Sequence, residues 1–335
     1  MISARSVAGR SNRTCPERRA QVRGRSFGLV AMLALLGLGA VLLGGCSTSA
    51  PLPIPDPALA DAGPVDPKAC RACEAWADPE DEGFVESADL SELSGLAASR
   101  TTKGVLYTHN DSGDTARFFA LGPTGALQAV LVLDGVEATD IEDIAVGPCP
   151  EGSCVFLGDI GDNDEKRKTI AIYRVKEPSL ANATLTPRVL TLTYPDGAHN
   201  AETLLVSPEG DLVIVTKTPT GRSAAYALGR AEVASAREAT LRRIGDVVVP
   251  KDGGGLVTGG SFHPCEKRVV LRTYTALFEY RFAGGLETLF ASPPTLLPAG
   301  REPQGEAVTY SADGTTIYTV SEGKRPPLHG KRCAP

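Results

Sequence analysis

The sequence predicts an all-β fold, a five-bladed propeller with four antiparallel strands in each blade. Strand-length apolar or alternating runs, bounded by Gly, Pro, Asp and Asn, occupy nearly all of the chain from Cys70 onwards. These runs resolve into five similar units, which is the pattern of a repeat fold. The last unit lacks one strand, and the strand-like segment 82–90, which precedes the first unit, can supply it. Such a closure leaves no free sheet edge.

The N-terminus indicates export. Seven arginines precede an apolar run at 27–43, which is typical of a signal peptide. The run ends in Leu43-Gly44-Gly45-Cys46, which resembles the bacterial lipobox, so we expect cleavage before Cys46 and lipidation of its thiol. The alternative is an uncleaved transmembrane anchor, because the run approaches the roughly 20 residues that span a bilayer.

The charge of the mature chain limits its partners. Residues 1–45 carry seven arginines and one glutamate, so their removal takes the formal charge from −6 to −12. An acidic domain lacks the basic face that binds nucleic acid. We expect instead a membrane attachment through Cys46 and an envelope ligand or protein as partner. Ser47 after the lipidated cysteine favours the outer membrane or periplasmic face of a bacterial cell envelope.

The chain divides into three parts. Residues 1–45 are assigned to a lipoprotein signal peptide. Residues 46–69 are rich in Pro, Ala and Ser and lack apolar periodicity, which is typical of a semi-extended tether. Residues 70–335 form the propeller domain.

The blades follow in chain order. The strands of the four complete units are 94–99, 105–110, 116–121 and 127–133; 141–146, 154–159, 169–175 and 188–194; 201–207, 212–217, 223–228 and 240–248; and 257–262, 268–274, 277–282 and 287–292. The fifth unit has strands at 305–310 and 316–321 and a weaker one around 328–329. We expect one helical turn near 230–237. The length of the third unit leaves a six-bladed propeller as the alternative.

Six cysteines remain after Cys15 and Cys46 are set aside, and an even number in an exported chain predicts disulfides. Cys149 and Cys154 are expected to close a turn between strands. The order of the units brings Cys265 and Cys333 together, which leaves Cys70 and Cys73 as a short CxxC loop. A redox or zinc role for that loop is disfavoured, because it follows a tether and has no accompanying metal ligands.

One position recurs at the head of the first strand of every blade. It is occupied by Ser94, Glu142, Glu202, Thr258 and Glu306, which we call the axial ring. If the blades surround an axis, three carboxylates and two hydroxyls converge on it. Crowded carboxylates raise one another's pKa unless a cation lies among them. Calcium accepts such oxygen ligands, so the ring predicts a Ca²⁺ site. In the alternative, these residues are solvated or paired with Lys217 and Arg272.

The axial ring resembles that of calcium-activated nucleotidases (apyrases), five-bladed propellers whose axial calcium site uses serine, glutamate, glutamate, serine and glutamate in blade order. Thr258 replaces one serine here. The resemblance covers the blade framework and these five positions but not the nucleotide-contacting residues, so it does not imply phosphohydrolase activity. The segments THNDSG, DIGDN, LRTYT, QGEAV and SEG also resemble a group of exported bacterial propellers of unassigned function, which implies the fold and export only.

Polar loops share the face of the axial ring. We expect Asp111, Asp159, Lys217, Arg272 and Glu322 to contact a ligand there. The acidic loops also suggest a second metal site, although Asx turns explain them better. The candidates for that site are Asp111, Asp114, Asp159, Asp162 and Asp164. His109 is the histidine placed to act as a general base.

These observations predict a lipid-anchored, exported propeller that binds a ligand or partner over a calcium-stabilised face. The alternative is a calcium-dependent phosphohydrolase of the nucleotidase or phytase kind. The sequence contains no GxSxG nucleophile motif and leaves the catalytic residues unassigned.

Overall fold

The computed structural model describes residue 59 and residues 63–111, 113–250 and 254–335. The signal peptide, Cys46 and most of the tether lie outside the described residues, so the expected cleavage and lipidation stay predictions. No helix within the described ranges is long and apolar enough to cross a membrane.

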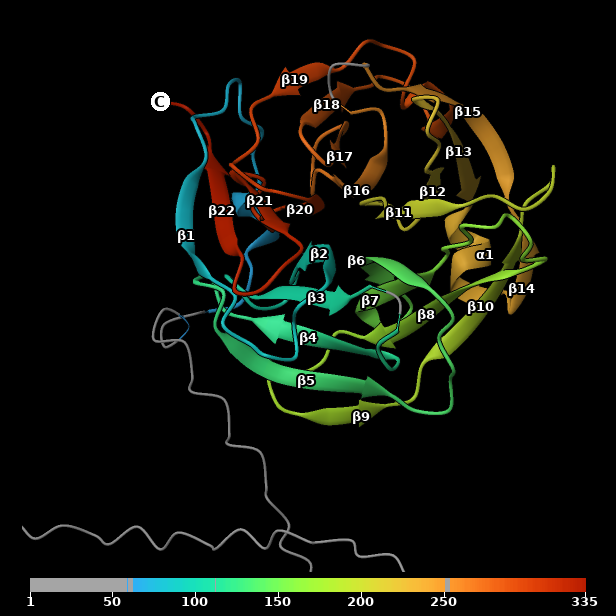
Figure 1. The fold of residues 1–335 in the computed structure, drawn as a ribbon, viewed down its shortest axis with the longest axis horizontal. Helices are drawn as coiled ribbons and strands as arrows, with labels where there is room; N and C mark the ends of the chain where they lie inside the picture. Colours follow the sequence, from blue (N-terminus) through green and yellow to red (C-terminus); the bar gives the residue numbers. More distant parts are fainter. Residues whose placement is uncertain (1–58, 60–62, 112, 251–253) are drawn as a thin grey trace, which may run out of the picture. The chain divides into compact units, whose positions relative to one another are not determined.

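Five sheets surround a central axis, with β2, β6, β11, β16 and β20 innermost (Figure 1). The prediction of a five-bladed all-β propeller is confirmed, and the six-bladed alternative is wrong. The strands of the first three blades are β2 (Leu93–Ala98), β3 (Leu106–Asn110), β4 (Arg117–Leu121) and β5 (Leu127–Leu133); β6 (Ile141–Cys149), β7 (Gly152–Asp159), β8 (Ile170–Lys176) and β10 (Arg188–Thr193); and β11 (Ala201–Val206), β12 (Leu212–Thr216), β13 (Arg222–Leu228) and β15 (Arg242–Val248).

The last two blades differ in how they obtain their outer strand. The fourth is β16 (Val257–Phe262), β17 (Arg268–Thr273), β18 (Leu277–Arg281) and β19 (Thr295–Leu297). The fifth is β20 (Gly305–Tyr310), β21 (Thr316–Ser321) and β22 (Pro327–Arg332), with β1 (Glu80–Phe84) at its outer edge. Because β1 pairs antiparallel with β22, the N-terminal strand closes the ring, as predicted.

The outer edges contain the departures from the expected strands. The outer strand of the fourth blade is not 287–292: Leu286–Thr288 form a 3-10 turn instead, and β19 follows it. Leu289 is buried in that turn, so its hydrophobicity reflects core packing and not a strand. Two short strands, β9 (Ala183–Leu185) and β14 (Glu238–Thr240), add parallel to β5 and β10. The expected helical turn is α1 (Arg230–Ser235).

The core lies between adjacent blades. Every residue of β2, β11 and β20 is buried, because an innermost strand is covered on both of its faces. The same burial agrees with the lack of regular alternation between apolar and polar residues in these strands. Tyr107, Tyr226, Tyr280 and Phe156 are fully buried in the clusters between blades.

The disulfide pairing differs in part from the expected one. Cys149 bonds to Cys154, as predicted. The other two bonds join Cys70 to Cys265 and Cys73 to Cys333, so the expected Cys265–Cys333 pair is wrong. The pairing of Cys70 and Cys73, which the sequence leaves open, is with these two cysteines and not with each other.

The path of the N-terminal segment explains this pairing. The segment runs extended along the fifth blade, where the Arg71 N–H donates to the Asp313 carbonyl and the Ala77 N–H donates to the Arg332 carbonyl. Trp76 forms an isolated bridge with Cys333. The segment therefore passes between the turn that holds Cys265 and the end of β22, and contributes one cysteine to each.

Replacing Cys73 and Cys333 together by alanine should lower the free energy of unfolding by about 4 kcal/mol, because this bond constrains a long loop of the unfolded chain. Its cysteines are 260 residues apart. The matched replacement of Cys149 and Cys154, only 5 residues apart, should cost about 2 kcal/mol. Urea unfolding without reductant measures both losses, and an equal or reversed order would contradict this expectation.

Candidate functional site

Each innermost strand carries a β-bulge at the axial-ring position. The register with the second strand of the blade shifts between Leu93 and Leu96, Ile141 and Asp143, Ala201 and Thr203, Val257 and Gly259, and Gly305 and Ala307. The residue inserted is therefore the ring residue, accompanied by Gly95 in the first blade. A bulge bends the strand and redirects a side chain. The same type of bulge therefore orients all five ring residues.

The three ring glutamates lie close enough to interact electrostatically and are nearly inaccessible to water. Glu142 is 3% exposed, and Glu202 and Glu306 are each 7% exposed. Burial raises the pKa of Glu142 well above its ordinary value, and the charge of Glu202 raises it further. Burial also raises the pKa of Glu202 to about 7 and that of Glu306 to about 8. Ionising all three together is therefore unfavourable without a cation.

Lys217 supplies one positive charge to this cluster. Its ammonium group forms a close ion pair with Glu202 and donates to the Tyr274 hydroxyl at 2.8 Å. Glu306 instead accepts a hydrogen bond from the Gln304 amide at 2.9 Å. Lys217 therefore neutralises one glutamate directly, and Glu142 and Glu306 gain only its longer-range effect.

The two ring hydroxyls join neighbouring blades. The Ser94 hydroxyl donates to the Glu142 carbonyl at 2.8 Å, and the Thr258 hydroxyl donates to the Gly305 carbonyl at 2.9 Å. Each hydroxyl hydrogen is thus used, while the oxygen keeps lone pairs that can accept.

A carboxylate cluster stands at one side of the ring. Carboxylate oxygens of Asp111, Asp140 and Glu142 all lie within 4.8 Å of one another. The Asp140 and Glu142 carboxylates repel each other when both are ionised, and burial raises the pKa of both groups. A side chain on Gly161 would collide with both of these carboxylates unless they moved, so glycine leaves room for their close approach. Asp140 was not predicted from the sequence, although it stands two residues before the ring position.

Asp143 is a second residue that was not predicted from the sequence. Its buried carboxylate accepts N–H groups from Ile144 and Leu204 at 2.8 Å, and from Gly260. It therefore links the innermost strands of three consecutive blades. Gly95 faces it from the first blade, where a Cβ would lie 2.8 Å from its Oδ1. The sequence does contain a signal for this residue, because Glu142 and Asp143 are adjacent acidic residues within an otherwise apolar strand.

Of the residues predicted to contact a ligand, some lie on the face of the axial ring and others lie in the interior of the protein. Asp111 lies in the carboxylate cluster, and Glu322 interacts with it electrostatically. Arg272 is fully buried in a close ion pair with Glu302 and is turned away from solvent. Asp159 is buried too, and it binds Arg167 at 2.8 Å and the Tyr173 hydroxyl at 2.8 Å. Arg272 and Asp159 therefore hold loops in place.

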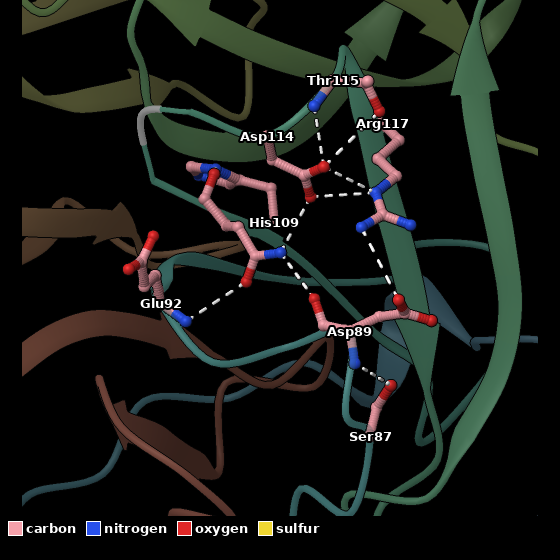
Figure 2. Close-up of polar contacts among 8 residues, drawn as sticks. Ser87, Asp89, Glu92, His109, Asp114, Thr115 and Arg117 are labelled. Atoms are coloured by element: carbon pink, nitrogen blue, oxygen red, sulfur yellow. Dashed lines mark hydrogen bonds and ion pairs between the residues drawn. The ribbon is translucent and has the colours of Figure 1, made fainter. Parts of the chain in front are cut away.

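Most of the acidic loop residues also have structural partners. Figure 2 shows Asp114 bound to the Arg117 guanidinium and the Thr115 N–H. The Asn110 amide also donates to Asp114. Asp162 accepts the Arg167 N–H, and Asp164 pairs with Lys166. These contacts agree with the Asx-turn interpretation. Asp111 alone of the five candidates belongs to a group with metal-ligand geometry among the described residues.

His109 is held as a neutral ring. Its Nε2 accepts the Gly95 N–H at 3.1 Å, and its Nδ1 donates to the Asn110 carbonyl at 2.7 Å. Burial lowers its pKa to about 4. Both nitrogens are engaged with backbone, so His109 positions β2 against β3 and is not placed as a general base.

No known protein family's profile matches the chain, and no curated protein gives a significant match. The chain is similar to solved structures at low identity. The PQQ-bound aldose sugar dehydrogenase from Streptomyces coelicolor is 13% identical with a TM-score of 0.47, over 78% of this chain and 99% of that one. A gluconolactonase from Xanthomonas campestris is 11% identical with a TM-score of 0.45, over 82% and 97%. Neither similarity informs what this chain binds.

The metal-free protein should lose stability as the pH rises from about 6.5 to 8.5. Glu202 and Glu306 have folded pKa values of about 7 and about 8 against 4.5 ordinarily, so the folded state keeps protons that the unfolded chain releases. The protonated glutamates stabilise the folded state at low pH, and this stabilisation is lost as the pH rises through their two folded pKa values. Below the window, neutral His109 and His263, with pKa values near 4, act in the opposite direction.

Thermal unfolding in the presence of a chelator measures this loss, which should be on the order of 2 kcal/mol. Glu306→Gln removes one of the two groups and should flatten the pH dependence. A variant at an exposed site, Glu238→Gln, should leave it unchanged. A melting temperature that rises between these pH values in the wild type would contradict the assignment.

Proposed function

We propose that this chain is a lipid-anchored, exported propeller that binds Ca²⁺ at the acidic mouth of its central channel and binds a ligand or partner over that face. We define the acidic mouth by its six carboxylates: Asp111, Asp140, Glu142, Glu202, Glu306 and Glu322. The observation that carries the proposal is the approach of Asp111, Asp140 and Glu142 within 4.8 Å of one another. Because Glu142 is buried and surrounded by negative charge, a cation there relieves repulsion that Lys217 leaves in place.

The chemistry of the donors favours calcium. Carboxylates, hydroxyls and backbone carbonyls are hard oxygen ligands, and Ca²⁺ accepts about six to eight of them in flexible geometry. Zinc and copper prefer the nitrogen and sulfur ligands that this mouth does not offer within the described residues. The cation would be held toward the side of the ring where Asp111 and Asp140 add to Glu142. Glu202, already paired with Lys217, would lie next to it.

The proposed location follows from the N-terminal sequence. A signal peptide over 1–45 and a lipidated Cys46 would attach the domain to the bacterial envelope through the tether 46–69. In that setting calcium is available at concentrations that modest sites can bind.

Isothermal titration of Ca²⁺ into the chelator-treated full chain should show one saturable site. Glu142→Gln should weaken binding by at least about tenfold, because it removes the most buried carboxylate of the cluster. Asp140→Asn should also weaken binding, although Asp140 is not an axial-ring residue. Glu238→Gln, an exposed carboxylate on β14, is the matched control and should bind as the wild type does. No heat of binding with the wild type would end the proposal.

A calcium-dependent phosphohydrolase is the second candidate. The observation in its favour is the Lys217 ammonium group, which lies between Glu202 and the Tyr274 hydroxyl beside the carboxylate cluster. A bound cation could polarise a phosphoryl oxygen while Lys217 contacts the same group. Arg272 is not available for this purpose, because Glu302 neutralises it in the interior.

The enzyme alternative predicts calcium-dependent phosphate release from at least one member of a panel of nucleotides, phytate and sugar phosphates. Lys217→Met should lower that release about a hundredfold, because removing a charged group that contacts the transition state costs a few kcal/mol. Release that persists in chelator, or none with any substrate while Ca²⁺ still binds, leaves the binding module as the function.

A further inference from the structure

A cavity of about 290 Å³ opens at the opposite end of the innermost strands from the axial ring. All five blades contribute one wall each, through Arg100, Val146, Val206, Pro264 and Ala312. The ring residues stand at the start of these strands and the cavity residues at their ends, which separates the two sites by roughly 15 Å. We call this space the Arg100 cavity. It shares no residue with the acidic mouth.

Arg100 is the one charged side chain among the described residues that line the cavity. Its backbone N–H donates to Glu177, but no described residue forms a hydrogen bond or ion pair with its guanidinium. The Ser99 hydroxyl, the Thr101 N–H and the Tyr107 hydroxyl all donate to Oε1 of Glu177, whose charge acts on Arg100 without a hydrogen bond to its guanidinium. Burial lowers the pKa of Arg100 to about 10 and Glu177 partly opposes this, so the group stays charged at neutral pH.

A second polar group that lines the cavity, from the second blade, also lacks a partner. The Ser153 hydroxyl oxygen is buried and has no hydrogen-bond partner among the described residues. Ser153 lies at the start of β7 and lines the cavity. A buried donor without a partner is costly, and such groups in native proteins are usually satisfied by a bound molecule or water.

The remaining walls are mostly apolar and are fixed in place. The apolar lining residues include Val65, Pro67, Val146, Val206, Pro264 and Ala312. Cys70, at the edge of the cavity, is bonded to Cys265 of the fourth blade, so the N-terminal segment that forms one wall is covalently held. Because this wall is already fixed, ligand binding costs little of its conformational entropy.

We propose that the Arg100 cavity binds a small carboxylate with an apolar body. A volume of about 290 Å³ is close to that of ten water molecules, which matches a ligand of on the order of ten non-hydrogen atoms. The guanidinium of Arg100 presents paired N–H donors suited to a carboxylate, and rotation about χ1 would turn the unpaired Ser153 hydroxyl toward the ligand as a further donor. One positive group balances one negative charge, which favours a monoanion over a phosphate dianion.

Isothermal titration of the full chain with benzoate and octanoate tests the assignment, with benzamide and octanamide as neutral probes of the same shape. At least one of the carboxylates should bind and the amides should not. Arg100→Gln should weaken binding by at least about tenfold, and Ser153→Ala by about threefold. Arg242→Gln removes an exposed arginine of β15 outside the cavity and should change nothing.

Further variants separate loss of binding from loss of folding. Arg100→Lys keeps the charge without the paired donors and should bind more weakly than the wild type. Ala312→Phe fills the cavity from a turn and should abolish binding while Arg100 remains. The proposal is overturned if neither carboxylate binds, if the amides bind equally, if phenyl phosphate binds more tightly than the carboxylates, or if folded Arg100→Gln binds as the wild type does.

Discussion

The antiparallel pairing of β1 with β22 is the contact on which the rest of the structure depends. It joins the N-terminal strand to the C-terminal blade and turns five separate sheets into a closed ring (Figure 1). Only in a closed ring do the innermost strands face a common axis at fixed spacing. The carboxylates of the acidic mouth come from four of the five blades, so their proximity is a property of the closure and not of any single blade.

Closure also explains why polar groups are tolerated in the channel. The buried Asp143 carboxylate is satisfied by N–H groups of three successive innermost strands, and the Ser94 and Thr258 hydroxyls each reach the next blade. These contacts exist only when neighbouring blades keep their spacing. The polar groups of the axis therefore depend on the ring, and in turn they fix how its blades are rotated against one another.

The repeat made the fold and the ring position predictable, because the same local pattern occurs five times and its bulge falls at the same place. Features that depend on the path of a single segment were not predictable. The apolar run at 287–292 suits a strand as well as a buried turn, and Leu289 packs in the latter way. The cysteine pairing depends on where the chain between Cys70 and Trp76 lies, and no periodicity encodes that path.

The charged residues themselves could be read from the sequence, but the residue with which each of them pairs could not. Lys217 and Arg272 occupy related positions on successive blades, yet Lys217 reaches the acidic mouth and Arg272 turns inward to Glu302. The decisive partner, Glu302, lies in the connection between β19 and β20 and not in a repeating strand. Asp140 was overlooked for a similar reason, since it belongs to the approach to β6 and not to the repeating strand.

The two long-range disulfides determine how the domain responds to mechanical load. A pulling force on the chain before Cys70 enters the domain at that residue and passes through covalent bonds into the fourth and fifth blades. The hydrogen bonds between β1 and β22, which follow in the chain, are then shielded from the load. The strand that closes the ring is therefore protected from being peeled away by a force applied to the chain that precedes it.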